Sequence, residues 1–150
     1  MSISRVAALL VVALFAAGTA YRAAWQHGGD RAVGWSDESA ALAGVELHRP
    51  VATSFGRQAD LARYLAPAVP RQLGFGGRQA VLIATGARSS AGYSIEVLGV
   101  REERSRVVVS VRERTPSSSQ PAPATLTFPY RLITVAVTGK HIEVEWRGRP

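Results

Sequence analysis

A serine in a glycine-containing stretch is the first residue that could do covalent chemistry. The sequence GYSIE, at 92–96, begins like the sharp turn that presents the nucleophilic serine of many hydrolases. That turn needs a second glycine two residues after the serine, because the chain must bend from a strand into a helix. Position 96 is glutamate, and the alternation of apolar and polar residues continues through Val97. The pattern predicts that Ser94 lies on the polar face of a continuous strand and is not a nucleophile.

The other residues that could form a catalytic, phosphate-binding or metal site are dispersed. The glycine-rich GFGG at 74–77 leads into a strand pattern, whereas a phosphate-binding loop opens a helix. The histidines lack the close spacing of metal ligands; they are His27, His48 and His141. The sequence has no cysteine and no obvious pair of catalytic carboxylates. We therefore expect a protein that is not an enzyme and that uses no cofactor and no metal.

The charge of the chain is strongly positive but evenly scattered. Lys and Arg number 18 against 11 Asp and Glu, which gives a formal net charge of +7 at pH 7. Lys140 is the only lysine, and the arginines stand singly along the sequence without forming a basic run. No nucleic-acid-binding module is recognisable. This distribution predicts weak attraction to anionic lipid or envelope polymer and no binding of nucleic acid.

Residues 1–20 have the pattern of an export signal. Arg5 precedes an uncharged apolar run over 6–17, and the small residues Gly18 and Ala20 have the spacing that signal peptidase requires. The alternative is an uncleaved membrane anchor, but the run is shorter than the ~20 residues of a spanning helix. We therefore expect an exported protein that is periplasmic, attached to the cell surface or secreted.

The rest of the chain is long enough for one compact core. Residues 21–43 mix small, polar and aromatic residues with no period of a helix or a strand, which predicts a flexible stalk. Residues 44–150 are expected to form a single β-rich domain. Within it, residues 45–48 fit a short strand, and residues 56–66 fit a helix that Thr53 or Ser54 would cap.

Strand patterns dominate from residue 79 onward. The nearly all-apolar QAVLIATG at 79–86 fits a strand that is covered on both faces. Four further strands are predicted by alternating residues: one with Tyr93, Ile95 and Val97, one with Val107, Val109 and Val111, one at 129–137, and one with Ile142, Val144 and Trp146. A two-residue turn at Gly139 and Lys140 is expected to join the last two as a hairpin. The predicted fold is α+β and mainly β, with a small five-stranded, mostly antiparallel sheet and one covering helix.

Two connections are candidates for binding a protein. The loop at 88–91 leads into Gly92, which lets the backbone turn sharply, and Tyr93 places a rigid ring at the base of the loop. The loop at 115–125 is rich in proline and serine and is too long for a simple hairpin turn, so it is either disordered or used for binding. Consecutive antiparallel strands put alternate connections at one end of a sheet. We therefore expect these two loops to lie together.

The order of these motifs resembles the C-terminal domain of the PrcB family over about Arg78–Val137. The similarity rests on SSAGYSIEVLGV, the following VRERTP and the later TFPYRLITV. The loop of that family typically reads Thr-Gly-Gly-Tyr, so this chain has alanine in place of the first glycine. The resemblance implies a set of protein-binding residues: Ser90, Ala91, Gly92, Tyr93, Pro129 and Tyr130.

The PrcB family is named for a non-catalytic lipoprotein subunit of a bacterial surface protease complex. The resemblance therefore implies an exported protein-binding module that associates with or stabilises another exported protein, such as a protease. A cysteine-free chain departs from this family in lacking the residue that a lipoprotein anchor uses. A second likeness, to small β inhibitors of cysteine proteases with a Thr-Thr-Gly-Tyr loop, suggests a peptidase inhibitor. An envelope-associated structural domain is the third alternative.

Overall fold

The computed structural model describes residues 30–66, 76–117, 119 and 122–148. Contacts divide the chain into a segment that ends at Asp30 and a compact body that begins at Arg31. The predicted export signal and residues 21–29 of the predicted stalk lie outside the described residues. Among the helices that the structure does describe, none has the length and apolarity needed to cross a membrane.

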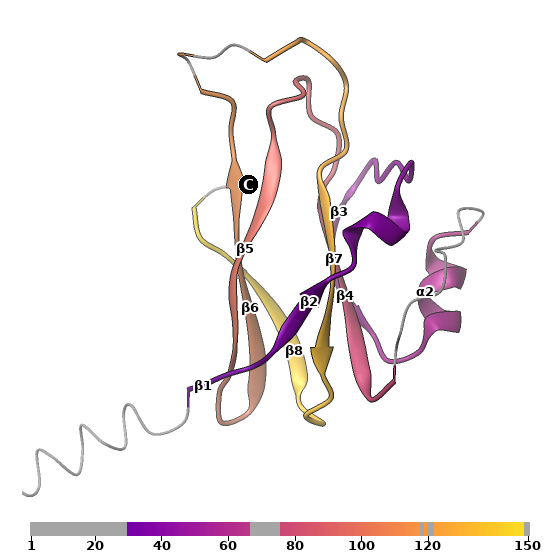
Figure 1. The fold of residues 1–150 in the computed structure, drawn as a ribbon, viewed down its shortest axis with the longest axis vertical. Coiled ribbons are helices and arrows are strands. Elements are labelled where there is room, and N and C mark those ends of the chain that lie inside the picture. Colours follow the sequence, from indigo (N-terminus) through magenta and orange to yellow (C-terminus); the bar gives the residue numbers. More distant parts are fainter. Residues whose placement is uncertain (1–29, 67–75, 118, 120–121, 149–150) are drawn as a thin grey trace, which may run out of the picture. The chain divides into compact units, whose positions relative to one another are not determined.

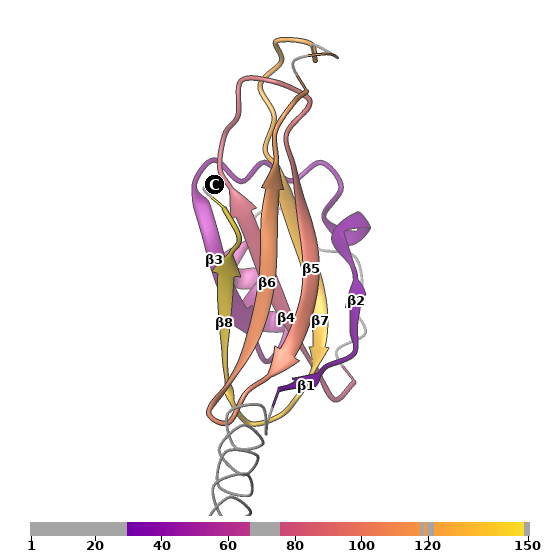
Figure 2. The same cartoon turned by 90° about the vertical axis from the view of Figure 1, so that its left-hand side faces the viewer.

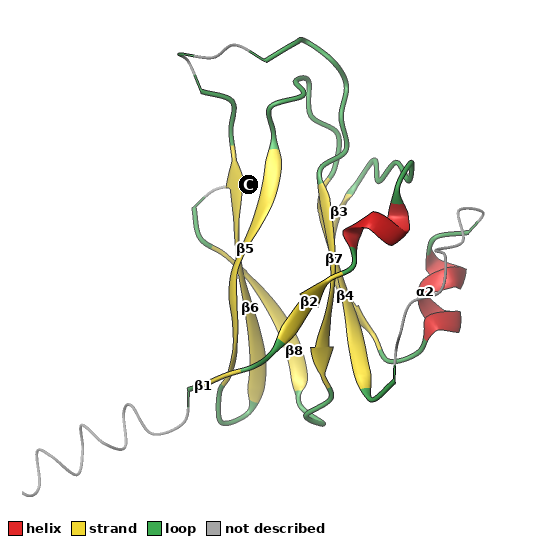
Figure 3. Cartoon of the chain, viewed as in Figure 1, coloured by secondary structure: helices red, strands yellow, loops and turns green. Residues whose placement is uncertain are grey.

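The body is built from two four-stranded sheets (Figure 1). Sheet A contains, in spatial order, β1 (Arg31–Ala32), β5 (Ser94–Glu102), β6 (Arg106–Arg114) and β8 (His141–Trp146). Sheet B contains β2 (Trp35–Asp37), β7 (Tyr130–Ala136), β4 (Arg78–Thr85) and β3 (Pro50–Phe55). Two short helices, η1 (Ser39–Leu42) and α2 (Gln58–Tyr64), lie on the side of sheet B that faces away from sheet A (Figure 3).

The main core lies between the sheets. Strand β6 contributes a row of valines on one face, and β4 and β7 face it with branched aliphatic side chains. Fully buried members of this core include Val107, Val109 and Val111 from sheet A, and Val81, Ile83, Ile133 and Val135 from sheet B. Removing these apolar side chains from water is the main source of the free energy that holds the sheets together.

A second core lies between sheet B and the helices. Leu82 and Leu132 point away from sheet A and pack with Leu42 of η1 and Leu61 of α2. Strand β4 is therefore buried on both of its faces, which confirms the prediction from its continuous apolar sequence. The predicted helix at 56–66 is also confirmed, with observed bounds of Gln58–Tyr64.

The predicted single five-stranded sheet and its last hairpin are wrong. Strand β7 already has β2 and β4 as neighbours, so the chain crosses to sheet A after the turn at Gly139. There β8 pairs with β6 in parallel, and Val144 stands opposite Val109. Figure 2 views this sheet from its outer side. Alternation along a strand fixes which side chains point inward, but it does not identify the neighbouring strand.

The first part of the body also differs from its prediction. Residues 31–42, expected in a flexible stalk, supply one short strand to each sheet and the fully buried Leu42. Residues 45–48 are not a strand, because the edge position of sheet B is taken by β3. Thr53 and Ser54 lie within β3, so neither caps α2, whose N-cap is Arg57. Short segments of this kind lack enough residues to show a period.

The aromatic side chain at the end of β8 should stabilise the domain. Trp146 is partly buried against the main core, together with Val144. Replacing Trp146 with alanine removes this packing and should lower the free energy of unfolding by ~3 kcal/mol, measured by urea denaturation. The matched control is Trp35→Ala on the exposed β2, which should change stability much less. Equal effects of the two substitutions would contradict the position of β8.

Candidate functional site

The two candidate loops pack against each other at one end of the sandwich (Figure 1). Arg88 and Thr127 form an isolated antiparallel bridge, in which each backbone N–H donates to the other residue's carbonyl at 2.8 Å. The Ala91 N–H donates to the Pro123 carbonyl at 3.2 Å, and the Thr127 hydroxyl donates to the Ser90 carbonyl at 2.8 Å. The expectation that the loops lie together is confirmed.

Gly92 allows the closest approach between the loops. A Cβ atom at this position would lie 2.9 Å from side-chain atoms of both Pro116 and Ala122. Real Cβ atoms almost never come so near to other heavy atoms, so any larger residue would push the loops apart. Gly92 is not among the described glycines with a positive φ angle. It is therefore needed for space and not, as expected from the sequence, for a sharp turn of the backbone.

A buried ion pair holds the base of the loops. The Arg88 Nε and Nη2 atoms donate to the two carboxylate oxygens of Glu113 at 2.7 and 3.2 Å. The Glu113 side chain is only 3% exposed. Arg88 Nη1 also donates to the Thr85 carbonyl at 3.1 Å, and the guanidinium lies 5.8 Å from the centre of the Tyr93 ring. The hydrogen bond to Glu113 raises the pKa of Arg88 above its ordinary value.

This ion pair links the two sheets. Glu113 continues the inward-facing row of Val109 and Val111 along β6, while Arg88 belongs to the loop that leaves β4 of the opposite sheet. A carboxylate so deeply buried is costly unless it is paired and hydrogen-bonded. The position of the 88–92 loop therefore follows from the need to neutralise Glu113.

Three of the predicted binding residues surround one pocket below the loops. The pocket has a volume of about 380 Å³ and is lined by Ser39, Ala40, Tyr93, Ser94, Ile95, Phe128, Pro129, Tyr130 and Arg131. It lies between β5, the start of β7 and η1. Tyr93 therefore lines the same pocket as Pro129 and Tyr130, although 36 or more residues separate it from them in the sequence.

The side chains of this pocket differ in what they can offer. The Tyr130 hydroxyl donates to the Leu42 carbonyl at 2.9 Å, and burial raises the pKa of that hydroxyl. Pro129 is buried, so it mainly packs within the domain. Ser94 is the first residue of β5 and stands opposite Arg114 of β6, as its predicted place on a strand requires. No cluster of His, Cys, Asp or Glu in the described ranges could hold a metal ion.

The outer face of sheet A carries a network of arginines and glutamates. Glu96 accepts hydrogen bonds from Arg114 Nε and Nη2 at 2.9 Å and from Arg112 Nη2 at 2.7 Å. These bonds, with that to Arg114 contributing most, lower the pKa of Glu96 to about 2. The carboxylate is therefore charged at every physiological pH, and it is shared by two arginines.

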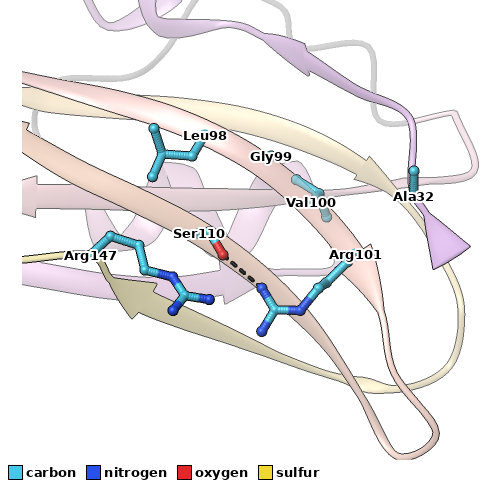
Figure 4. A pocket seen from close by; sticks show the side chains of 7 residues that line it. All are labelled: Ala32, Leu98, Gly99, Val100, Arg101, Ser110 and Arg147. Carbon is cyan, nitrogen blue, oxygen red and sulfur yellow. Dashed lines mark hydrogen bonds between the residues drawn. The ribbon is translucent and has the colours of Figure 1, made fainter. Parts of the chain in front are cut away.

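A second pocket of about 370 Å³ opens on this outer face (Figure 4). Its lining residues are Ala32, Leu98, Gly99, Val100, Arg101, Ser110 and Arg147. A β-bulge interrupts the pairing of β5 with β6 between Val97 and Gly99, and Leu98 at the bulge is 44% exposed. Arg101 Nη1 donates to the Ser110 hydroxyl at 2.8 Å across the floor.

Sequence reasoning missed several residues of this region. Leu126, beside the Arg88–Thr127 bridge, is 62% exposed, which is the highest exposure of the large apolar residues that the structure describes. Its position in a proline-rich loop gave no periodic signal. Glu113, in contrast, could have been found, because it has the same strand parity as Val107, Val109 and Val111.

Comparison with known families supports the resemblance seen in the sequence. Residues 80–136, less than half of the chain, match the family model described as PrcB C-terminal. The match extends from β4 to the end of β7 and includes all of the predicted protein-binding residues. This confirms the similarity that was stated over about Arg78–Val137. No curated protein and no solved structure matches the chain significantly.

The ion pair at the base of the loops should show strong coupling. Arg88→Met leaves the Glu113 carboxylate buried without its partner and should lower the free energy of unfolding by ~3 kcal/mol. The double variant with Glu113→Leu should recover much of this loss, because no buried charge remains. Denaturant unfolding of both single variants and the double variant measures the coupling. Simply additive losses would show that the two side chains act independently.

The contact at Gly92 should be sensitive to a single methyl group. Gly92→Ala would force Pro116 and Ala122 to move and should cost ~1 kcal/mol of stability. Gly34→Ala is a suitable control, because its added Cβ would meet no atom within 4 Å. Thermal unfolding compares the two variants, and faster amide exchange at Ala91 would report separation of the loops. An unchanged melting temperature with Gly92→Ala would contradict the close approach.

Proposed function

We propose that this chain is an exported, non-catalytic subunit that binds a partner protein, and that its PrcB C-terminal region presents the loop at 88–92 and the segment at 122–127 that packs against it to that partner. The match to the family model supports an accessory role beside a protease. The apolar run and small residues at 1–20 support export.

The observation that carries the proposal is the combination of fixed loops with an exposed apolar side chain. Leu126 projects from a loop that the Arg88–Thr127 bridge and the Ala91–Pro123 hydrogen bond hold in place. Its neighbours Pro123 and Ala124 are also exposed. Loops that are ordered before binding lose less conformational entropy when a partner arrives, so modest contacts suffice for useful affinity.

An exposed apolar residue at the opposite end of the sandwich supplies the control. Val137, which follows β7, is 52% exposed and lies away from both candidate loops (Figure 1). Leu126→Ser should reduce capture of the partner from the exported fraction by about tenfold, as expected for an apolar residue at the centre of an interface. Val137→Ser should leave capture unchanged. Both substitutions are on the surface and should keep the fold.

The measurement is quantitative mass spectrometry of proteins retained by the purified chain and its two variants. Equal retention by Leu126→Ser and Val137→Ser would place the interface away from the loops. Absence of any protein retained by the unmodified chain would favour an envelope-associated structural domain. Inhibition of the captured protein's peptidase activity would identify the chain as an inhibitor, whereas unchanged or increased activity fits an accessory subunit.

A further inference from the structure

Part of β5 forms an edge of sheet A, where no described strand pairs with it on the side away from β6. Strand β5 pairs with β6 from Ser94 to Glu102, apart from the bulge at Leu98, but β1 covers only Arg101 and Glu102 on the other side. The Val33 N–H extends this contact by one bond, to the Val100 carbonyl at 2.9 Å. Within the described part of the chain, no further backbone group bonds to residues 94–98 from this side.

The open stretch results from the path of the chain after β1. Residues 33–34 carry the chain out of sheet A, and it becomes β2 in sheet B. The equivalent position beside the start of β7 is filled by η1, where the Ser39 Oγ accepts a hydrogen bond from the Leu132 N–H at 3.1 Å. The position beside the start of β5 is not filled in this way. An added strand there would lie in line with β1.

The unpaired backbone groups belong to Ile95 and Val97. Along a strand, side-chain direction and hydrogen-bonding side alternate together. Val100 has an inward side chain and directs its carbonyl toward β1. Beyond the bulge, Val97 stands opposite Val111, whose carbonyl accepts a hydrogen bond from the Arg147 N–H on the other side of β6. Val97, and Ile95 two residues before it, therefore direct their N–H and C=O groups toward the open side. Unpaired groups of this kind are the template that an incoming strand uses.

The open stretch is bordered by the pocket below the loops. Tyr93, Ser94 and Ile95 form one wall of that pocket, while η1 and the start of β7 form the opposite wall. A strand paired with Ile95 and Val97 would direct every second side chain inward, toward this space of about 380 Å³. The aromatic rings of Phe128 and Tyr130 favour an apolar side chain there.

The charges near this stretch determine which residues are favoured at the outward-facing positions of an added strand. Arg112 and Arg114 share the single carboxylate of Glu96 on the outer face, and their side chains are 49% and 59% exposed. Among the residues that the structure describes, this cluster has two guanidinium groups and one carboxylate, on a chain whose net charge is +7. Arg112 and Arg114 reach from β6 across to Glu96 on β5, so their guanidinium groups lie toward the open edge. The net positive charge of the three side chains favours acidic residues at the outward positions of an added strand, except directly opposite Glu96. A second copy of the chain would bring like charges together.

We propose that residues 94–98 bind an extended segment of the partner protein by strand addition, with apolar residues directed into the pocket and acidic residues directed toward Arg112 and Arg114. The inference rests on the proposed function, because it takes the occupant to be a segment of that partner. Main-chain hydrogen bonds would give affinity, and the alternating apolar and acidic side chains would give specificity.

The test uses the purified full-length chain and a short synthetic peptide of alternating valine and glutamate. Binding is measured by fluorescence anisotropy of a labelled peptide, and the site by amide hydrogen exchange. The peptide should bind and should slow exchange at the Ile95 and Val97 amides. A peptide of alternating valine and lysine, and one with the same composition in scrambled order, should bind at least about tenfold more weakly.

A matched pair of variants isolates the backbone contact. Val97→Pro removes an N–H that points to the open side and does not bond to β6, whereas Val97→Ala shortens the same side chain and keeps the N–H. Only Val97→Pro should weaken peptide binding, by about tenfold. If Val97→Pro fails to fold, a peptide N-methylated on alternate residues provides the same test with the unmodified chain.

Several outcomes would overturn the inference. These are equal binding of the N-methylated and unmethylated peptides, protection at amides other than Ile95 and Val97, and self-association of the chain through β5 in sedimentation experiments. Retention of the partner by Val97→Pro as strongly as by Val97→Ala would reject strand addition and leave the proposed function intact. Loss of retention in Leu126→Ser alone would likewise assign the partner to the loops and not to this edge.

Discussion

The buried carboxylate of Glu113 is the constraint on which the loop end of the domain depends. It occupies an inward position on β6, where its neighbours in the row are valines, and a buried carboxylate is costly there unless it is paired and hydrogen-bonded. Arg88 supplies that cation from the opposite sheet and simultaneously pairs its backbone with Thr127. One ion pair thus joins the two sheets and orders two loops that are distant in sequence.

The layers of the fold decide which surfaces remain for binding. Helices and the segment before β3 cover the far side of sheet B, and the two sheets cover each other. The outer face of sheet A carries ion pairs between arginines and glutamates. Besides the pocket at Leu98, two surfaces with apolar or unpaired groups are described: the loop end with Leu126 and the uncovered stretch of β5. The uncovered stretch begins at Ser94, directly after the 88–92 loop, so these two surfaces are adjacent (Figure 2).

Features that depend on neighbours within a strand were predictable from the sequence. The two-sided burial of β4 and the inward valines of β6 follow directly from their residue patterns. The resemblance also led to the loop residues that the structure brings together, such as Gly92. The assignment of strands to two sheets could not be predicted, because pairing depends on which edges are free once all strands are placed. Strand β8 is an example, because its residue pattern fits either sheet. Both edges of β7 are already paired, so β8 pairs with β6 instead. The contribution of residues 31–42 was missed for a related reason, since each of its elements is too short to carry a period.

Parallel pairing of β6 with β8 delays completion of the core during folding. Strands β5 and β6 can form an early hairpin, since only three residues separate them, but β8 must wait until the intervening loop and β7 have been placed in sheet B. Non-local pairing of this kind slows folding, because the entropy of closing the chain is lost before the contact forms. Until β8 docks, the backbone groups on one edge of β6 have no strand to pair with. A strand edge of this kind can pair with another chain, so the late position of β8 in the sequence makes correct docking of this strand important for avoiding aggregation.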